Sequence, residues 1–220
     1  MNPSTAQPDS VTAETVHPEA AHLKPVNPVE REVLAAIAAR SSPRAFAPRP
    51  LGREKLLKVL EAARWAASSN NEQPWRFVVA SREDPEAFGT LLECLKESNR
   101  VWAQHASALL LVVARTTFER SGGPNKYAWH DTGQAVAHLA LRATALGLAL
   151  HQMGGIYPER AAEVYGVLEP HVVVSAAALG YPGDPANLPE DLRDKEARPR
   201  TRKPLSEFVF SGRFGEPAEL

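Results

Sequence analysis

The sequence ASSNNEQPWRF at residues 67–77 joins two segments of different periodicity. Residues 56–64 before it have the apolar spacing of an amphipathic helix, and residues 77–80 after it are typical of a strand. The loop between them is rich in Ser and in amide side chains, which offer hydrogen-bond donors and acceptors without a net charge. Such side chains suit the edge of a flat heterocycle, although an ordinary polar connection has the same composition.

Two basic segments lie far from this loop in the sequence. Residues 40–46 (RSSPRAF) carry two Arg and two Ser side chains, and residues 200–203 (RTRK) lie near the C-terminal end. Arg binds phosphate oxygens bidentately, and hydroxyl groups add neutral hydrogen bonds. Each segment alone is compatible with a solvated surface or with ion pairing, but the three segments in this order are more specific.

Together with Gly147-Leu148 and Gly154-Gly155, these segments resemble the FMN-dependent nitroreductase family over about residues 29–209. The matching motifs are R-x-S-x-R at 40–44 and S-x-x-N-x-Q-P-W at 68–75. The resemblance implies a mixed α/β fold of the α+β class, with a central, mostly antiparallel sheet flanked by helices. It also implies an intertwined homodimer with each FMN at the subunit interface, and a C-terminal arm, about 183–220, that reaches the partner subunit.

The same resemblance implies a set of cofactor-binding residues. At the phosphate and ribityl end these are Arg40, Ser41, Ser42, Arg200 and Arg202. The flavin chemistry needs no catalytic side chain, because N5 of the cofactor exchanges the hydride.

At the ring end, Arg44 matches the family's cation near N1 and O2, where it would stabilise negative charge. The loop matches are Asn71, at the ring, and Ser68 and Ser69, which reach a cofactor held mainly by the partner subunit. Further predicted contacts are Asn99 at the pyrimidine edge and the backbone of Met153, Gly154 and Gly155. The alternatives are an Asn on a helix surface and a plain glycine turn.

Two positions depart from the family pattern. Ala67 stands where many members have Pro, and Trp102 stands where some have Lys. The second departure leaves Arg44 as the only cation expected near the ring.

Length and composition predict one soluble domain. The chain has 220 residues, of which 44% are hydrophobic and 23% charged, and its net charge is −1. This charge gives no attraction to nucleic acid or to a membrane surface. The single cysteine, Cys94, is expected to pack in the core. No 18-residue apolar run and no signal peptide are visible, so a cytoplasmic protein is expected.

The pattern of elements predicts two parts. Residues 1–26 contain four Pro among small polar residues and are expected to be disordered or loosely packed, and residues 27–220 form the FMN-binding domain. Helices are predicted at 27–39, 53–65, 84–95, 131–150 and 158–165, and strands at 76–80, 108–114 and 172–179. A breaker-rich loop is expected at 119–127, a polar arm without its own core at 183–204, and an apolar tail after it.

These features predict an FMN-dependent oxidoreductase that uses NADH or NADPH to reduce nitroaromatic, quinone or similar electron-poor acceptors by a ping-pong mechanism. The alternatives are a specialised member of the fold, such as a dehalogenase or a semialdehyde or enone reductase, and a non-catalytic flavin-binding protein. His130 beside Asp131 has no third ligand at usable spacing, so no metal site is predicted.

Overall fold

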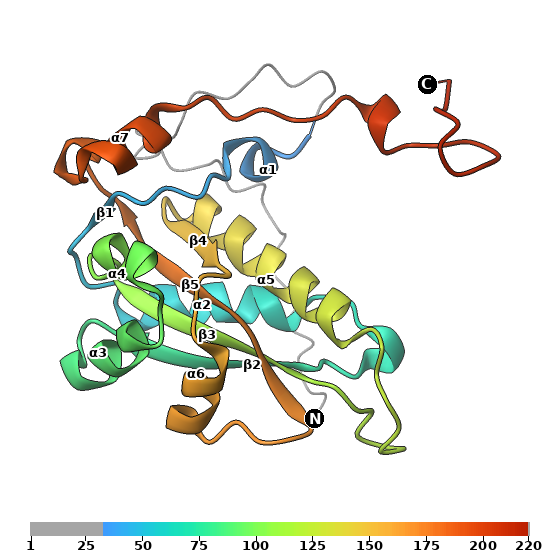
Figure 1. Cartoon of the computed structure of the whole chain (residues 1–220), viewed down its shortest axis with the longest axis horizontal. Coiled ribbons are helices and arrows are strands. Elements are labelled where there is room, and N and C mark those ends of the chain that lie inside the picture. Colours follow the sequence, from blue (N-terminus) through green and yellow to red (C-terminus); the bar gives the residue numbers. More distant parts are fainter. Residues whose placement is uncertain (1–32, 220) are drawn as a thin grey trace, which may run out of the picture.

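The computed structural model describes residues 33–219 and contains a five-stranded antiparallel sheet (Figure 1). Strand β5 (His171–Pro182) pairs with β1 (Phe46–Ala47), β3 (Ala108–Arg115) and β4 (Ala149–Met153), and β3 pairs in turn with β2 (Trp75–Ser81). The predicted fold class, a mostly antiparallel sheet flanked by helices, is confirmed.

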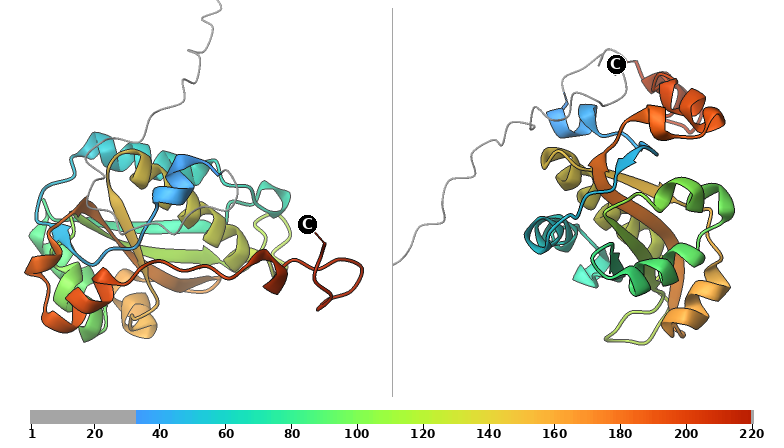
Figure 2. Two further views of the ribbon diagram at one scale, coloured as in Figure 1. Left: turned by 90° about the horizontal axis from the view of Figure 1, so that it is seen from above. Right: turned by 90° about the vertical axis from the view of Figure 1, so that its left-hand side faces the viewer.

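Helices cover both faces of the sheet (Figure 2). On one face lie α2 (Arg53–Arg64) and α5 (Ala128–Ala145), and on the other lie α3 (Pro85–Glu93), α4 (Glu97–Ala103) and α6 (Pro158–Tyr165). This explains why β3 is apolar from Ala108 to Ala114, since alternate side chains of a strand point to opposite faces. Leu109 and Leu111 enter one core cluster, whereas Leu110 and Val112 enter the other.

The long helix α5 supplies the apolar stripe that was predicted. Ala135, Leu139 and Ala143 are fully buried against α2 and the sheet. The predicted end of this helix at residue 150 is wrong, because α5 ends at Ala145 and β4 begins at Ala149. Gly147 between them has a φ of 71°, which ends the helix, and the apolar residues that follow fit a strand as well as a helix.

The C-terminal arm contains more structure than its polar sequence indicates. A short turn of 3-10 helix (η3, Pro185–Asn187) leads into α7 (Glu190–Ala197), and Leu188 and Leu192 are buried in the core of the same protomer. The arm thus has no separate core and packs instead on the core of the sheet, a contact that was not predicted. The elements α4, β1 and β4 were also not predicted from the sequence.

Beyond α7 the chain runs past α1 (Ala35–Ala39) and away from the sheet (Figures 1 and 2). It forms η4 (Leu205–Glu207) and a turn closed by a bridge between Phe210 and Pro217. Phe214 at this turn is 96% exposed. The expectations for residues 1–26, and for the start of the first helix at 27–32, lie outside the described residues. Within residues 33–219, no helix has both the length and the apolar character needed to cross a membrane.

Candidate functional site

The first half of the predicted site is the segment that follows α1. The guanidinium of Arg40 donates a hydrogen bond of 3.1 Å to Ser42 Oγ. Ser41 is buried, and its hydroxyl has no hydrogen-bond partner in the described part of the chain. Because a buried hydroxyl without a partner is unfavourable, this group is suited to a ligand that accepts or donates a hydrogen bond there.

The C-terminal arm closes on this segment from the other side. The Arg200 guanidinium donates hydrogen bonds to the main-chain carbonyls of Arg40 and Ala38, the second at 2.8 Å. Its Nε remains buried and without a partner. Arg200 thus joins the arm to the end of α1, a role that the sequence analysis did not predict, while keeping one donor available.

The arginines of this cluster repel one another. Burial, followed by the charge of Arg202, lowers the pKa of Arg40. Burial, followed by the charges of Arg40 and Arg202, also lowers the pKa of Arg200. Within residues 33–219 no carboxylate forms an ion pair with any of the three. An anion bound between them would therefore be stabilised strongly.

Asn99 of α4 lies against the glycine pair that follows β4. The Asn99 Nδ2 atom and the Lys96 main-chain N both donate to the Gly155 carbonyl, each at 2.9 Å. A Cβ at Gly155 would lie 2.5 Å from Asn99 Nδ2, whereas a Cβ at Gly154 would meet nothing within 4 Å. The surface over Gly154 is therefore open, while Gly155 lies close against the Asn99 side chain. Met153 is buried in the core, so only its main chain faces this surface.

Trp102 of α4 links the glycine pair to residues 43–46 through contacts with Phe46 and His151. Its ring is fully buried, 6.1 Å from the Phe46 ring and 4.5 Å from the His151 ring, measured between centroids. His151 Nδ1 lies 2.9 Å from the Pro43 carbonyl oxygen. Trp102 is thus a core residue that joins α4, β1 and β4. His151 therefore packs between the Trp102 ring and the main chain at Pro43.

The second half of the predicted site is the amide-rich loop, which includes η2 (Ser69–Asn71). Asn70, Asn71 and Gln73 have φ values of 54°, 56° and 50°, which residues with side chains rarely adopt. Ser68 Oγ accepts a hydrogen bond of 3.0 Å from Gln73 N, and Trp75 after the loop is buried. Asp131 Oδ2 accepts a hydrogen bond of 2.9 Å from Ser69 N.

The two halves are held by different elements of the protomer. Asp131, which holds the loop, is in the first turn of α5, whereas the glycine pair follows β4 and the arginine segment follows α1. Within residues 33–219 no hydrogen bond or ion pair joins Ser68, Ser69 or Asn71 to the other predicted site residues, which are Arg40, Ser41, Ser42, Asn99, Gly155 and Arg200.

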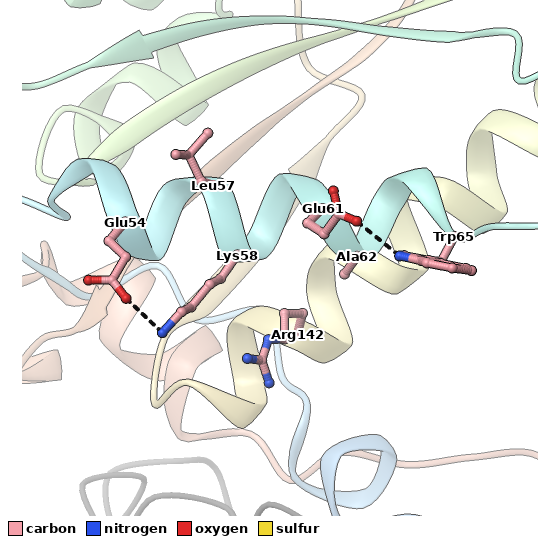
Figure 3. Close-up of a pocket in the computed structure, with 7 residues that line it drawn as sticks. All are labelled: Glu54, Leu57, Lys58, Glu61, Ala62, Trp65 and Arg142. Carbon is pink, nitrogen blue, oxygen red and sulfur yellow. Dashed lines mark hydrogen bonds and ion pairs between the residues drawn. The ribbon is translucent and has the colours of Figure 1, made fainter. Parts of the chain in front are cut away.

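A surface groove lies along α2, between this helix and Arg142 of α5 (Figure 3). It is lined by Glu54, Leu57, Lys58, Glu61, Ala62, Trp65 and Arg142, and it contains none of the predicted site residues. Trp65 is 74% exposed at one end of it, with its Nε1 atom 3.0 Å from Glu61 Oε1.

Sequence reasoning missed two buried carboxylates at the site. Asp131 was considered only as a neighbour of His130, whose Nδ1 does lie 3.1 Å from Asp131 Oδ1. Glu196 of α7 accepts the Arg44 main-chain N–H at 3.2 Å with either oxygen. Its position in the polar arm gave no signal, since 152 residues separate the two partners. In the described part of the chain, no group of three or more His, Cys, Asp or Glu side chains is arranged to hold a metal ion.

The fold is an antiparallel sheet between two helical layers, and the arginine cluster lies where the segment after α1 meets the C-terminal arm. The chain belongs to the nitroreductase family, whose defining sequence pattern matches residues 37–181. Its enzyme class is accordingly that of the nitroreductase-type oxidoreductases.

Three similar proteins illustrate the relationship. A solved structure of an oxidoreductase containing FMN is 37% identical, with a TM-score of 0.80, and the match covers 86% of this chain and 96% of that one. A provisionally named nitroreductase from Desulfovibrio desulfuricans, solved in complex with FMN, is 28% identical, with a TM-score of 0.62 and coverage of 84% and 99%. A protein from Archaeoglobus fulgidus, provisionally named NADH dehydrogenase/NAD(P)H nitroreductase, is 32% identical over 158 residues, which are 70% of this chain and 87% of the relative.

Proposed function

We propose that the protein binds FMN between two identical subunits. The bound FMN passes electrons from NADH or NADPH to flat, electron-poor acceptors, such as nitroaromatics or quinones, in a ping-pong reaction. The observation that carries the proposal is the cluster of Arg40, Arg200 and Arg202, none of which forms an ion pair with a carboxylate of residues 33–219. The FMN contained in two similar solved structures supports the choice of ligand.

The residues present fit the phosphate end of FMN. Arg40 and Arg202 supply charge, the Ser41 hydroxyl and Arg200 Nε are buried groups that still need a partner, and Ser42 is already oriented by Arg40. Charge-assisted hydrogen bonds to a phosphate would satisfy these donors at once. The family's phosphate position is therefore chemically reasonable for this chain.

The residues also fit the ring end. The open surface over Gly154 allows a flat ring to approach the main chain closely, and Asn99 keeps one amide hydrogen that is not used for Gly155. Arg44 places a cation where negative charge accumulates on the N1 and O2 side of the ring. FMN supplies the hydride chemistry when bound, and the protein supplies binding, orientation and this charge.

A homodimer completes the site in this proposal. Ser68, Ser69 and Asn71 of one subunit would meet the arginine half of the other, as the family resemblance implies, since no hydrogen bond or ion pair joins the two halves within residues 33–219 of one protomer. The arm, about 183–220, would bind its own core through α7 and reach the partner with its exposed Phe-bearing turn. Residues 27–220 form the functional domain, with residues 1–26 as an accessory extension.

The first test is the visible spectrum of the purified protein, followed by anaerobic addition of NADPH and then NADH. A flavin spectrum that bleaches on either addition supports the proposal, and release of the chromophore identifies FMN by its mobility. A colourless protein that does not bind added FMN would refute it. Bound FMN with negligible turnover of every acceptor would instead favour a non-catalytic flavin-binding protein, and turnover restricted to one narrow acceptor class would favour a specialised member of the fold.

The shared site is tested by subunit complementation. Arg40→Ala and Asn71→Ala protomers are co-expressed with different tags, and the heterodimer is purified through both. If each site takes one half from each subunit, the heterodimer has one intact site and one site with both substitutions, so it binds about half the wild-type amount of FMN tightly. If both halves came from one subunit, every site would carry one substitution and no tight binding would return.

A further inference from the structure

Two acidic side chains are buried in the described part of the chain, and both contact the predicted FMN site. Asp131 is 2% exposed and Glu196 is 5% exposed. A buried carboxylate is unfavourable unless hydrogen bonds or charges compensate it. Each of the two accepts a main-chain N–H from one of the two site segments, so their burial coincides with the two halves of the site.

Asp131 holds the amide-rich loop. Its Oδ2 atom accepts from Ser69 N at 2.9 Å, and its Oδ1 atom lies 3.1 Å from His130 Nδ1. The loop contains three left-handed residues other than Gly, a conformation that persists only where the surroundings fix it. Asp131 supplies a fixed point at the start of this strained turn, and Ser68 Oγ supplies another through Gln73 N.

Glu196 holds the arginine-bearing segment. Both of its oxygens lie 3.2 Å from the main-chain N of Arg44. Helix α7, which carries it, is anchored by Leu192 in the core. On the other side, His151 approaches the carbonyl oxygen of Pro43. The main chain at 43–44 is thus held from both sides, which fixes the direction in which the Arg44 side chain leaves it.

We infer that Asp131 and Glu196 are positioning residues, one for each half of the FMN site, that act by fixing main-chain N–H groups and do not touch the cofactor. This inference rests on the proposed FMN site. It adds that the affinity of each half depends on a carboxylate from a distant part of the chain. Preorganised contacts of this kind lower the cost of ordering a site when the ligand binds.

The test compares substitutions that keep or remove the acceptor oxygen. Asp131→Asn and Glu196→Gln keep one, whereas Asp131→Leu and Glu196→Met are close in volume and remove it. The Leu and Met variants leave the N–H of Ser69 or Arg44 without its acceptor and therefore also lose stability, so the free energy of unfolding is measured beside FMN affinity for each variant. Thr144→Ala is the matched control, because Thr144 is also buried in α5 and bonds a main-chain oxygen, that of Ala140, at 2.9 Å.

The dissociation constant of FMN is measured by quenching of flavin fluorescence, well below the unfolding temperature of every variant. We expect it to rise at least about tenfold in the Leu and Met variants, which is about 1.4 kcal/mol, and to stay within about threefold in the Asn and Gln variants and the control. Leu and Met variants that are folded and bind FMN as tightly as the wild type would overturn the inference. A wild-type protein that does not bind FMN would refute the proposed function instead.

If the Leu or Met variants do not fold, the inference is tested by amide hydrogen exchange in the Asn and Gln variants. A neutral amide is a weaker acceptor than a carboxylate, so the N–H of Ser69 in Asp131→Asn and of Arg44 in Glu196→Gln should exchange faster than in Thr144→Ala. Unchanged exchange at both positions would overturn the inference.

Discussion

The substitution Gly155→Ala tests the ring end of the site with a single methyl group. An added Cβ would lie 2.5 Å from Asn99 Nδ2, while its other neighbours, Asn99 Cγ and Lys96 Cβ, would be at 3.5 and 3.9 Å. Gly155 is not among the residues with positive φ, so the backbone accepts alanine without strain. Only the end of the Asn99 side chain has to move.

The effect on stability should be small. Moving Asn99 removes its hydrogen bond to the Gly155 carbonyl, worth about 0.5–1.5 kcal/mol, while the bond from Lys96 N to the same oxygen remains. Alanine also lowers the conformational entropy of the unfolded chain, which stabilises the folded state by about 0.4–1 kcal/mol. The free energy of unfolding should therefore change by less than about 1 kcal/mol. The loss of the predicted Asn99 contact to FMN should raise the dissociation constant about five- to tenfold, which is about 1–1.4 kcal/mol.

The assay is a double-mutant cycle of Gly155→Ala with Asn99→Ala, followed by FMN titration and urea unfolding. Because both changes act through one amide group, the double variant should bind FMN no more weakly than either single variant. Gly133→Ala, on the exposed side of α5 with nothing within 4 Å, is the control and should leave FMN affinity unchanged. Wild-type affinity in Gly155→Ala, or full additivity in the cycle, would refute the reasoning.

Three further predictions concern charge, burial and the arm. Arg44→Ala should lower the reduction potential of bound FMN, with Arg44→Lys intermediate, as measured by spectroelectrochemistry; an unchanged potential would reject the role of this cation. Burial, followed by the charge of Cys94, raises the pKa of Tyr165 to about 12, above its ordinary value of 10.0. The unfolded chain therefore loses this proton first, and stability falls as the pH rises through 10 to 12. Tyr165→Phe should flatten that fall in urea unfolding, and an equally steep fall would contradict it. A chain that ends after Ala197 should lose the Arg200 contacts and yield monomer without FMN by size-exclusion chromatography. Removal of residues 1–26 should leave FMN bound. A dimer with FMN in the first case, or loss of FMN in the second, would contradict the proposed domain limits.

Much of the fold follows from the sequence, because its strongest signals are local. The apolar run of β3 requires both faces to be covered, and the stripe of α5 identifies one of the covering helices. The predicted end of α5 was wrong because the apolar residues 148–150 are compatible with a helix or a strand. Only their pairing with β5 decides between the two. Helix α7 was missed because its sequence, EDLRDKEA, has one apolar anchor, Leu192, which becomes informative only beside the core that receives it.

The site divides in the same way. The segments at 40–44, 68–75 and 200–202 could be identified because Arg and Ser side chains suit a phosphate and amide side chains suit the edge of a ring. Their supports could not, since Asp131 and Glu196 lie 62 and 152 residues from the groups they hold. A carboxylate that bonds a main-chain N–H leaves no pattern at the position of its partner, because any residue except Pro provides that group. The cofactor-binding roles of the individual residues remain predictions.

The arrangement of the two halves has a consequence for how the proposed dimer would work. Each half is fixed within its own protomer, the loop by Asp131 and the arginine segment by Glu196, His151 and Arg200. Folding of the protomer therefore orders both halves before any cofactor is present, and neither half alone surrounds a flavin. Joining two subunits brings ordered surfaces together, so little conformational entropy is lost when FMN binds. In the proposed dimer, FMN affinity is thereby tied to subunit association, and dilution that separates the subunits should release the cofactor while leaving each protomer folded.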